Sequence, residues 1–311
     1  MRRLTSAAVL GVLVASGVGA CGSGATGTSL LLTPTHVIPI MVMRRGPTVR
    51  AYARVTIEGH SYAMVLDSGA GRTVVTYTVR RSLRLPSRGA TRRIPALGCS
   101  VLVAPVVVSR WRLEGIALPK MVIMSRGLLG PSRVAGLTVA GALGSDVLSR
   151  FRTITFELSR RRLILGQSGQ PAPHGSLIRR AAGPLNGFDQ AVRVTIDGAR
   201  VPMVVDTGSA YSTVDAPTTR RFRLGLAGPL VTGRTAAGCA VSAVPVMIMR
   251  WAVGSVRLPS ALVLDILTST PFSELRVHGL LGADILSKFS RVTLDFANHR
   301  IALDGPMFPR R

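Results

Sequence analysis

One seven-residue stretch occurs twice in this chain, and its repetition constrains the fold more than any other feature. Residues 64–70 read Met-Val-Leu-Asp-Ser-Gly-Ala, and residues 203–209 read Met-Val-Val-Asp-Thr-Gly-Ser. Each copy is an apolar run that ends at an aspartate, followed by a hydroxyl residue, a glycine and a small residue. Carboxylates are rarely buried without compensation, and the chain has only 14 acidic residues, so two of them at the ends of apolar runs need an explanation.

The similarity between the two halves extends well beyond these stretches. Three further pairs of segments match at offsets of 138 to 140 residues: 54–59 with 193–198, 98–99 with 238–239, and 143–151 with 281–289. Offsets that drift so little indicate the duplication of one unit with small changes in loop length. We therefore expect two lobes, residues 35–167 and 174–305, joined by a Gly- and Pro-containing linker at 168–173 and followed by a tail at 306–311.

Hydrophobic patterns predict β-strands within each lobe. Alternating segments that end at an acidic-Gly turn, and the apolar runs that follow them, predict hairpins at residues 52–66 and 191–205. The best helix candidates are residues 145–151 and 283–289, with Ser145 or Asp146 able to cap the first. The matching Asp284 starts the second, and we expect both aspartates to cap rather than to catalyse. The predicted class is all-β, with one short helix in each lobe.

Two duplicated lobes that face each other would bring their aspartates together. Across a pseudo-twofold axis, Asp67 and Asp206 cannot both ionise, so they would share one proton and divide into an acid and a base. Such a pair can activate a water molecule. The alternative is that each Asp-Ser/Thr-Gly sequence forms a solvent-exposed turn of its own lobe.

This pattern resembles the aspartic peptidases of the retropepsin and pepsin clan. In each half, the aspartate motif is followed about 76 residues later by an apolar-apolar-Gly segment, at 142–144 or 280–282, and then by a predicted helix. A single Asp-Thr-Gly is common by chance, whereas two in register within a duplication are specific. The resemblance covers roughly residues 50–305, and it implies two β-barrel lobes related by a pseudo-twofold axis in a monomer that acts as a pseudo-dimer.

The resemblance also implies roles for individual residues. Asp67 and Asp206 would be catalytic, hydrolysing a peptide bond through water without a covalent intermediate. Six neighbours would support the catalytic loops, the hydroxyls by hydrogen bonds across the axis and the glycines by letting backbone amides approach: Ser68, Gly69, Ala70, Thr207, Gly208 and Ser209. Four residues would pack beneath these loops: Leu143, Gly144, Leu281 and Gly282.

In the clan, the substrate binds beneath β-hairpin flaps that hydrogen-bond an extended peptide. The flap candidates are residues 95–98 and 235–238, which end at Gly98 and Gly238. Cys99 and Cys239 follow at equivalent positions, and equivalent positions near a twofold axis can meet. Two alternatives stay open for them: a disulfide between the lobes, or two buried thiols that pack as small hydrophobes.

The N-terminus predicts export. Residues 1–21 have a charged start, a short apolar core at 7–18 and small residues, which is typical of a signal peptide. Residues 18–21, Val-Gly-Ala-Cys, resemble the lipobox of bacterial lipoproteins, in which Cys21 is lipidated; a plain secretory signal is the alternative. Residues 22–34 would then be a flexible tether. We expect a protein anchored at the outer face of the bacterial cytoplasmic membrane or in the cell envelope.

The net charge of +25 comes almost entirely from arginines scattered along the chain. We expect them mostly on solvated faces, where they favour anionic lipid or acidic partners. No nucleic-acid partner is expected, because no recognition motif is evident. The five histidines show no ligand spacing, so we expect no metal and no cofactor. The expected partners are a peptide or protein substrate and, through Cys21, the membrane.

Two functions from different classes fit this sequence. One is an aspartic endopeptidase, and the other is a catalytically silent, peptidase-like binding or scaffold protein. A third reading takes residues 67–72, Asp-Ser-Gly-Ala-Gly-Arg, as the phosphate loop of an actin-like ATPase. The export signal and the lack of companion motifs disfavour this reading.

Overall fold

The computed structural model describes residues 9–10, 35–46, 48–166, 174–182, 187–268 and 272–306. Several predictions lie outside the described residues: the lipidated Cys21, the tether, the linker 168–173, and, except for β1 (Val9–Leu10), the signal peptide. Residues 307–311 of the predicted tail also lie outside, while Pro306 ends the last strand. None of the helices within these ranges has the length and the apolar run that crossing a membrane would require.

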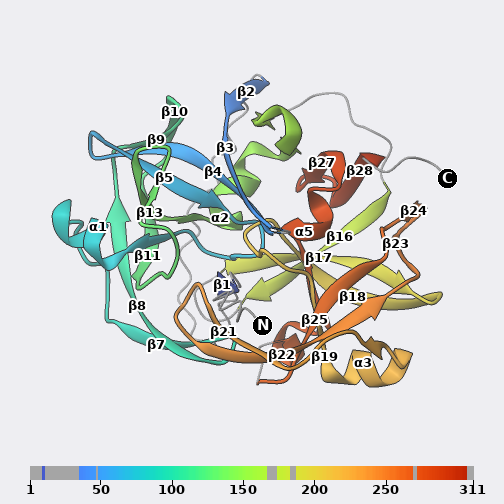
Figure 1. Cartoon of the computed structure of the whole chain (residues 1–311). Helices are drawn as coiled ribbons and strands as arrows, with labels where there is room; N and C mark the ends of the chain where they lie inside the picture. The colour runs from blue at the N-terminus through green and yellow to red at the C-terminus, as the bar shows by residue number, and fades with distance from the viewer. Residues whose placement is uncertain are drawn as a thin grey trace.

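The N-terminal lobe is built on an 11-stranded sheet, which forms the blue to green half of Figure 1. Its strands are β3 (Met41–Arg45), β4 (Thr48–Ile57), β5 (His60–Leu66), β6 (Val74–Thr76), β7 (Arg92–Ala96), β8 (Cys99–Val108), β9 (Trp111–Leu113), β10 (Ile116–Leu118), β11 (Met121–Arg126), β12 (Arg133–Val134) and β13 (Leu137–Leu143). β13 pairs in parallel with β5, the strand that leads to Asp67. β6 lies between β11 and β13.

The C-terminal lobe repeats this arrangement, in yellow and orange in Figure 1. Its strands are β17 (Gly187–Ile196), β18 (Ala199–Asp206), β19 (Thr213–Asp215), β20 (Gly225–Leu226), β21 (Val231–Thr235), β22 (Ala240–Ile248), β23 (Trp251–Val253), β24 (Val256–Arg257), β25 (Ala261–Ile266) and β26 (Gly279–Gly282). β26 pairs in parallel with β18, and β19 lies between β25 and β26, as in the first lobe. β1 pairs in parallel with β21. The predominance of strands in both lobes confirms the predicted all-β class.

Six strands, contributed by both lobes, lie side by side in the other sheet and join the lobes. In order they are β2 (His36–Pro39), β15 (Arg162–Leu165), β14 (Thr153–Glu157), β27 (Phe289–Asp295), β28 (Arg300–Pro306) and β16 (Gly175–Ala182), and each pairs antiparallel with the next. At the centre, Thr155 lies opposite Thr293, and their hydroxyl oxygens are 2.9 Å apart. These two positions are equivalent in the duplication, so the pseudo-twofold axis passes between β14 and β27.

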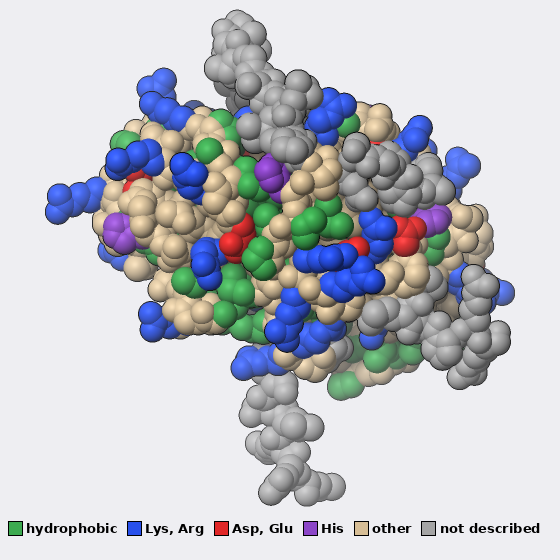
Figure 2. Space-filling view, turned by 90° about the horizontal axis from the view of Figure 1, so that it is seen from above, with side chains coloured by type: hydrophobic (Ala, Val, Ile, Leu, Met, Phe, Trp, Pro, Cys, Tyr) green, Lys and Arg blue, Asp and Glu red, His purple; other side chains and the backbone are tan. Residues whose placement is uncertain are grey.

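The duplication also holds for single side chains of the core. Trp111 and Trp251 are both buried, and each indole Nε1 donates a hydrogen bond to a proline carbonyl eight residues further on, Pro119 or Pro259. The surface is different in character. Lys and Arg side chains are spread over the face shown in Figure 2, with few acidic side chains between them.

The prediction of one short helix in each lobe was wrong, because each lobe has an additional helix about ten residues after its Asp-Ser/Thr-Gly sequence. The predicted helices are present as α2 (Ser145–Leu148), which continues as a 3-10 turn η1 (Ser149–Phe151), and α5 (Ala283–Leu286). The additional ones are α1 (Tyr77–Ser82) and α3 (Ala216–Phe222); shorter elements are η2 (Leu158–Arg160) and α4 (Phe272–Leu275). α1 and α3 present no apolar stripe to find by periodicity; each starts at a capping side chain, Thr76 or Asp215.

Candidate active site

The two aspartates meet at the centre of the molecule. Asp67 directly follows β5 and Asp206 ends β18, and both side chains are fully buried, with 0% of their surface exposed. Gly69 lies against Asp206, and Gly208 lies against Asp67. A Cβ atom at either glycine would overlap the carboxyl carbon of the opposite aspartate. Each loop therefore requires a glycine so that the other lobe's carboxylate can approach its backbone.

Hydrogen bonds across the axis hold the two loops together. Ser68 Oγ donates to the carbonyl of Val205 at 2.7 Å and accepts from the amide of Thr207 at 3.1 Å. Reciprocally, Thr207 Oγ1 donates to the carbonyl of Leu66 at 2.8 Å and accepts from the amide of Ser68 at 3.0 Å. All four bonds are buried, so they fix the separation of the two aspartates.

The apolar-apolar-Gly segments lie beneath these loops. Leu143 accepts a hydrogen bond from the amide of Asp67 at 3.0 Å, and Gly282 is the register partner of Asp206 in the parallel pair β18–β26. Leu143 and Leu281 are buried core residues next to their glycines. The backbone of Gly144 is so close to the first loop that a Cβ would be 2.6 Å from the carbonyl oxygen of Ala70. These segments thus form the floor of the site.

A hydroxyl residue in each loop connects it to the following helix, and these residues were not predicted. Thr73 Oγ1 accepts from the amide of Gly144 at 3.0 Å and donates to Asp146 at 2.6 Å. Ser212 Oγ makes the same two bonds, with Gly282 at 2.9 Å and Asp284 at 2.8 Å. The signal in the sequence was that both residues are hydroxyls at equivalent positions of the duplication.

The capping role predicted for the helix aspartates was wrong. The N-caps of α2 and α5 are Gly144 and Gly282, which have no side chain to donate or accept. Asp146 and Asp284 turn back from the first helical turn and accept hydrogen bonds from Thr73 and Ser212, and Asp284 also accepts the amide of Ile285. Ser145 does not cap α2 either, because its hydroxyl donates to the carbonyl of Ser68 at 2.7 Å. Burial raises the pKa of Asp146, and it raises the pKa of Asp284 to about 6.

The environments of Asp67 and Asp206 differ. Burial raises the pKa of both, but Asp206 Oδ1 accepts hydrogen bonds from the amides of Gly208 and Ser209 at 2.9 and 2.8 Å, which hold its pKa at about 6. The pKa of Asp67 is raised further than that of Asp206. Burial is the largest cause, the negative charge of Asp206 raises it again, and the amide of Ala70 opposes the rise. These surroundings favour a pair that shares one proton, with the proton on Asp67 and the negative charge on Asp206.

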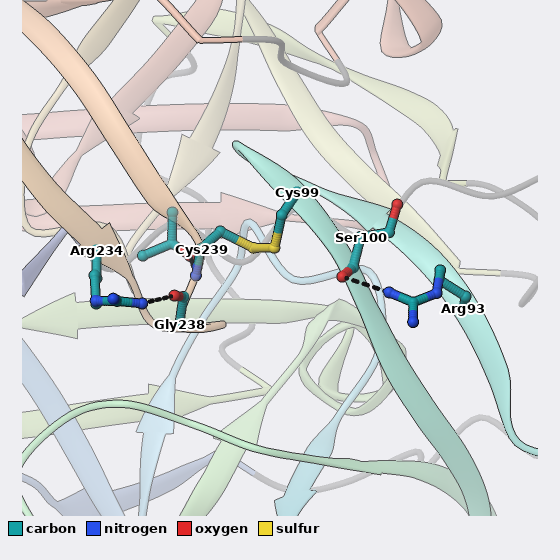
Figure 3. Close-up of a disulfide and its surroundings, with 7 residues drawn as sticks. Arg93, Cys99, Ser100, Arg234, Gly238 and Cys239 are labelled. Carbon is teal, nitrogen blue, oxygen red and sulfur yellow. Dashed lines mark hydrogen bonds between the residues drawn. A yellow bond between two sulfur atoms is a disulfide. The ribbon is translucent and has the colours of Figure 1, made fainter.

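The two flap hairpins cross to the opposite lobe and are covalently joined. The turns between β7 and β8 and between β21 and β22 contain Gly98 and Gly238, with φ of +83° and +88°. Directly after them, a disulfide joins Cys99 to Cys239, with their Cα atoms 5.4 Å apart (Figure 3). Of the two alternatives that the sequence left open, the structure has the bridge.

Side-chain packing anchors both hairpin tips. Leu97, at the first tip, is fully buried in a cluster of the C-terminal lobe that includes Val241 and Phe272. Ala236, at the second tip, packs with Ala70 beside the catalytic loop of the N-terminal lobe. The carbonyl of Ala236 also accepts a hydrogen bond from the amide of Leu129 at 2.7 Å. Each tip thus covers the other half of the site.

A cavity of about 470 Å³ lies beside the pair on the N-terminal lobe. Gly208 from the catalytic loop and Ala236 from the flap line it, together with Tyr77 and Leu128. Its walls are mainly apolar, which suits the side chains of a peptide. Over the ranges that the structure describes, His, Cys, Asp and Glu side chains form no cluster of three that could bind a metal ion.

The model of the aspartyl protease family matches residues 53–147 and residues 192–285, once in each lobe and over more than half of the chain. The chain belongs to the aspartyl protease family. No curated protein sequence matches this chain. Among solved structures, it is similar to conglutin gamma, a basic 7S globulin from lupine seeds, with 13% identity and a TM-score of 0.46; the match covers 88% of this chain and 95% of that chain.

Each matched region contains one aspartate of the pair, the loop that follows it and the segment beneath that loop. The structure brings these predicted residues together at one site, and it brings Gly98, Gly238 and the cysteines together above them. Arg126 was not predicted. It lies close enough to Asp67 for its charge to lower the pKa of that carboxyl.

Proposed function

We propose that this aspartyl protease is an endopeptidase that hydrolyses peptide bonds through a water molecule activated by Asp67 and Asp206. The observation that carries the proposal is the buried pair of carboxyl groups, whose unequal surroundings favour one ionised and one protonated member. Two titratable groups with pKa values that are pushed apart are the usual basis for an acid and a base in one site.

In the proposed reaction, Asp206 accepts a proton from the water as its oxygen attacks the carbonyl carbon of the substrate. Asp67 donates its proton to the carbonyl oxygen, which gives a tetrahedral diol. When the C–N bond breaks, Asp206 donates its proton to the leaving amine, and Asp67 recovers a proton from a diol hydroxyl. Both residues thus return to their starting states, and no covalent intermediate forms.

One feature favours a second candidate function, a peptidase-like binding protein without turnover. The disulfide and the buried Leu97 hold the flaps closed over the site, which would restrict the entry of an extended chain. Such a protein would keep the fold and bind peptide, but it would not cleave it.

Cleavage of a mixed peptide library, followed by mass spectrometry from acidic to neutral pH, separates these functions. We expect cleavage by the wild type and a loss of roughly a hundredfold or more in Asp67→Asn and Asp206→Asn, since each substitution removes one member of the acid–base pair. Cleavage that survives in both variants would reject this mechanism. An intact library at every pH, with and without a dithiol reductant, would favour the binding protein.

We also propose that the protein is exported and held at the membrane by a lipid on Cys21, where it meets peptide or protein substrates. The charged start, the apolar core and the Val-Gly-Ala-Cys segment support this proposal. Mass spectrometry of the mature N-terminus should find a diacylated Cys21, and Cys21→Ala should release the protein from the membrane fraction. A mature N-terminus at any other residue would contradict it.

A further inference from the structure

Arg126 is a buried cation beside the active site for which the reaction above has no use. It ends β11, and only 5% of its surface is exposed. Its electrostatic neighbours are Asp67 and Tyr77. Burial lowers the pKa of the guanidinium to about 10, so it stays protonated at neutral pH. The site therefore holds a permanent positive charge close to one member of the catalytic pair.

The guanidinium lacks hydrogen-bond partners at two of its nitrogens. Within the described residues, Nε and Nη2 of Arg126 are both buried and neither donates a hydrogen bond. A buried charge with unpaired donors is unfavourable unless another group compensates it. A guanidinium matches a carboxylate best, because its fork of N–H groups can donate two parallel hydrogen bonds.

The fold does not require an arginine at this position. In the N-terminal lobe, Arg126 is the register partner of Thr76, and in the C-terminal lobe Ile266 is the register partner of Asp215 in the same way. Ile266 is buried at 3% exposure in an apolar cluster. The same place in the duplicated lobe is thus filled by an ordinary apolar side chain. This difference between the halves suggests that Arg126 serves the ligand rather than the core.

Arg126 also adjoins the cavity. Its register partner Thr76 and the next residue, Gly127, both line the cavity, as does Tyr77. The same cavity is lined by Gly208, which lies against the carboxyl group of Asp67. Two other arginines, Arg50 and Arg81, line the cavity itself, and no acidic residue among those that the structure describes does so. A substrate side chain in this cavity would therefore lie against a positively charged wall, close to the aspartate pair.

We propose that this cavity is a specificity subsite for an acidic side chain next to the scissile peptide bond, with Arg126 as the residue that determines the preference. The inference rests on the endopeptidase function proposed above and names its substrate class. The carboxylate of a substrate Glu or Asp would accept hydrogen bonds from the buried guanidinium. A neutral side chain would leave these donors unpaired.

Matched peptides that differ only by Glu or Gln next to the cleaved bond test the proposal. We expect kcat/KM to favour the Glu peptide roughly tenfold to a hundredfold, the usual range for hydrogen bonds to a charged group. In Arg126→Met, the Glu/Gln ratio should fall close to one, whereas the matched control Arg257→Met, at an exposed arginine of β24, should keep the wild-type ratio. A wild-type ratio close to one, or a preference that Arg126→Met retains, would overturn the subsite.

Binding separates this inference from the function on which it rests. In Asp206→Asn, calorimetry should show the Glu peptide binding more tightly than the Gln peptide, and Arg126→Met in this background should remove the difference. If the wild type cleaves neither peptide but this binding difference holds, the subsite stands and the endopeptidase fails. If both peptides are cleaved and bound equally, the endopeptidase stands and the subsite fails.

A folding control completes the test. Because Ile266 fills the equivalent place, Arg126→Met should fold with a Tm equal to or above that of the wild type. If it does not fold, Arg126→Lys provides the comparison, since it keeps the charge but loses the fork. This variant should reduce the Glu/Gln ratio several-fold, and an unchanged ratio would contradict the role of Arg126.

Discussion

Ser68 and Thr207 exchange hydrogen bonds across the pseudo-twofold axis, each donating to the other lobe's strand and accepting from the other's amide. The two lobes are thus coupled at the residues directly after Asp67 and Asp206. The coupling is reciprocal, so losing either hydroxyl leaves an amide and a carbonyl of the opposite lobe without this partner.

Replacing Thr207 by valine should destabilise the protein and slow catalysis. The amide of Ser68 and the carbonyl of Leu66 would remain buried without this partner, which costs about 1–3 kcal/mol for each unsatisfied group. Urea unfolding should therefore show a loss of about 2 kcal/mol or more. Thr207→Ser keeps the hydroxyl and should stay within about 1 kcal/mol of the wild type. Equal stability of the valine variant would show that the bonds are not important.

Peptide cleavage should have a bell-shaped pH dependence. Activity requires an ionised Asp206, whose pKa is about 6, so kcat/KM should rise as the pH increases through about 6. It should fall again where Asp67, whose pKa is raised further, loses its proton. The optimum is therefore expected above pH 6, between the two ionisations. An optimum well below pH 6, with activity lost on approach to neutrality, would contradict the inferred protonation states of Asp67 and Asp206.

The stability of the protein should decrease as the pH rises towards neutrality. A carboxyl group whose pKa is raised in the folded state binds its proton more tightly there, so its stabilising effect is lost as the pH passes through the folded pKa. Asp284, with a folded pKa of about 6, should contribute about 2 kcal/mol to this loss between about pH 4 and pH 7.

Asp284→Asn isolates this contribution, because the amide does not titrate and can still accept from Ser212. The free energy of unfolding of this variant should change less over the same pH range. Urea unfolding at both ends of the range measures the difference, with the exposed Asp197→Asn as a matched control. If the free energy of unfolding depends on pH identically in Asp284→Asn and in the wild type, the raised pKa of Asp284 is rejected.

Removing the disulfide should loosen both flaps. The bridge spans 140 residues, and a loop of that length corresponds to about 4–5 kcal/mol in the chain-entropy model. We expect the double variant Cys99→Ser/Cys239→Ser to lose several kcal/mol in its free energy of unfolding. Its amide hydrogens should also exchange faster at residues 92–104 and 231–241. Leu97 should keep the first tip partly docked, so adding Leu97→Ala should accelerate exchange further. Unchanged exchange in the triple variant would mean that other contacts hold the flaps.

The meeting of the two aspartates was predictable because the signal was local and occurred twice. Asp67 and Asp206 each end an apolar run, and a common offset relates them, so the duplication itself indicated the axis. α1 and α3 were missed because a single capping side chain starts each of them, without apolar periodicity. Arg126 was missed because it was viewed as one of many scattered arginines. Aligning the two halves position by position would have matched Arg126 with Ile266, an apolar residue at the equivalent position of β25.

The sheet that joins the lobes determines how a separated half would behave and suggests how the duplicated chain arose. β14 and β27 satisfy each other's backbone groups where Thr155 meets Thr293, so cutting the protein in half would leave an open hydrogen-bonding edge on either piece. Because the two edges derive from one ancestral strand, a solitary half could close its own edge by pairing with an identical copy. Tandem fusion would then have freed each half to specialise, which a symmetric assembly of identical subunits cannot do.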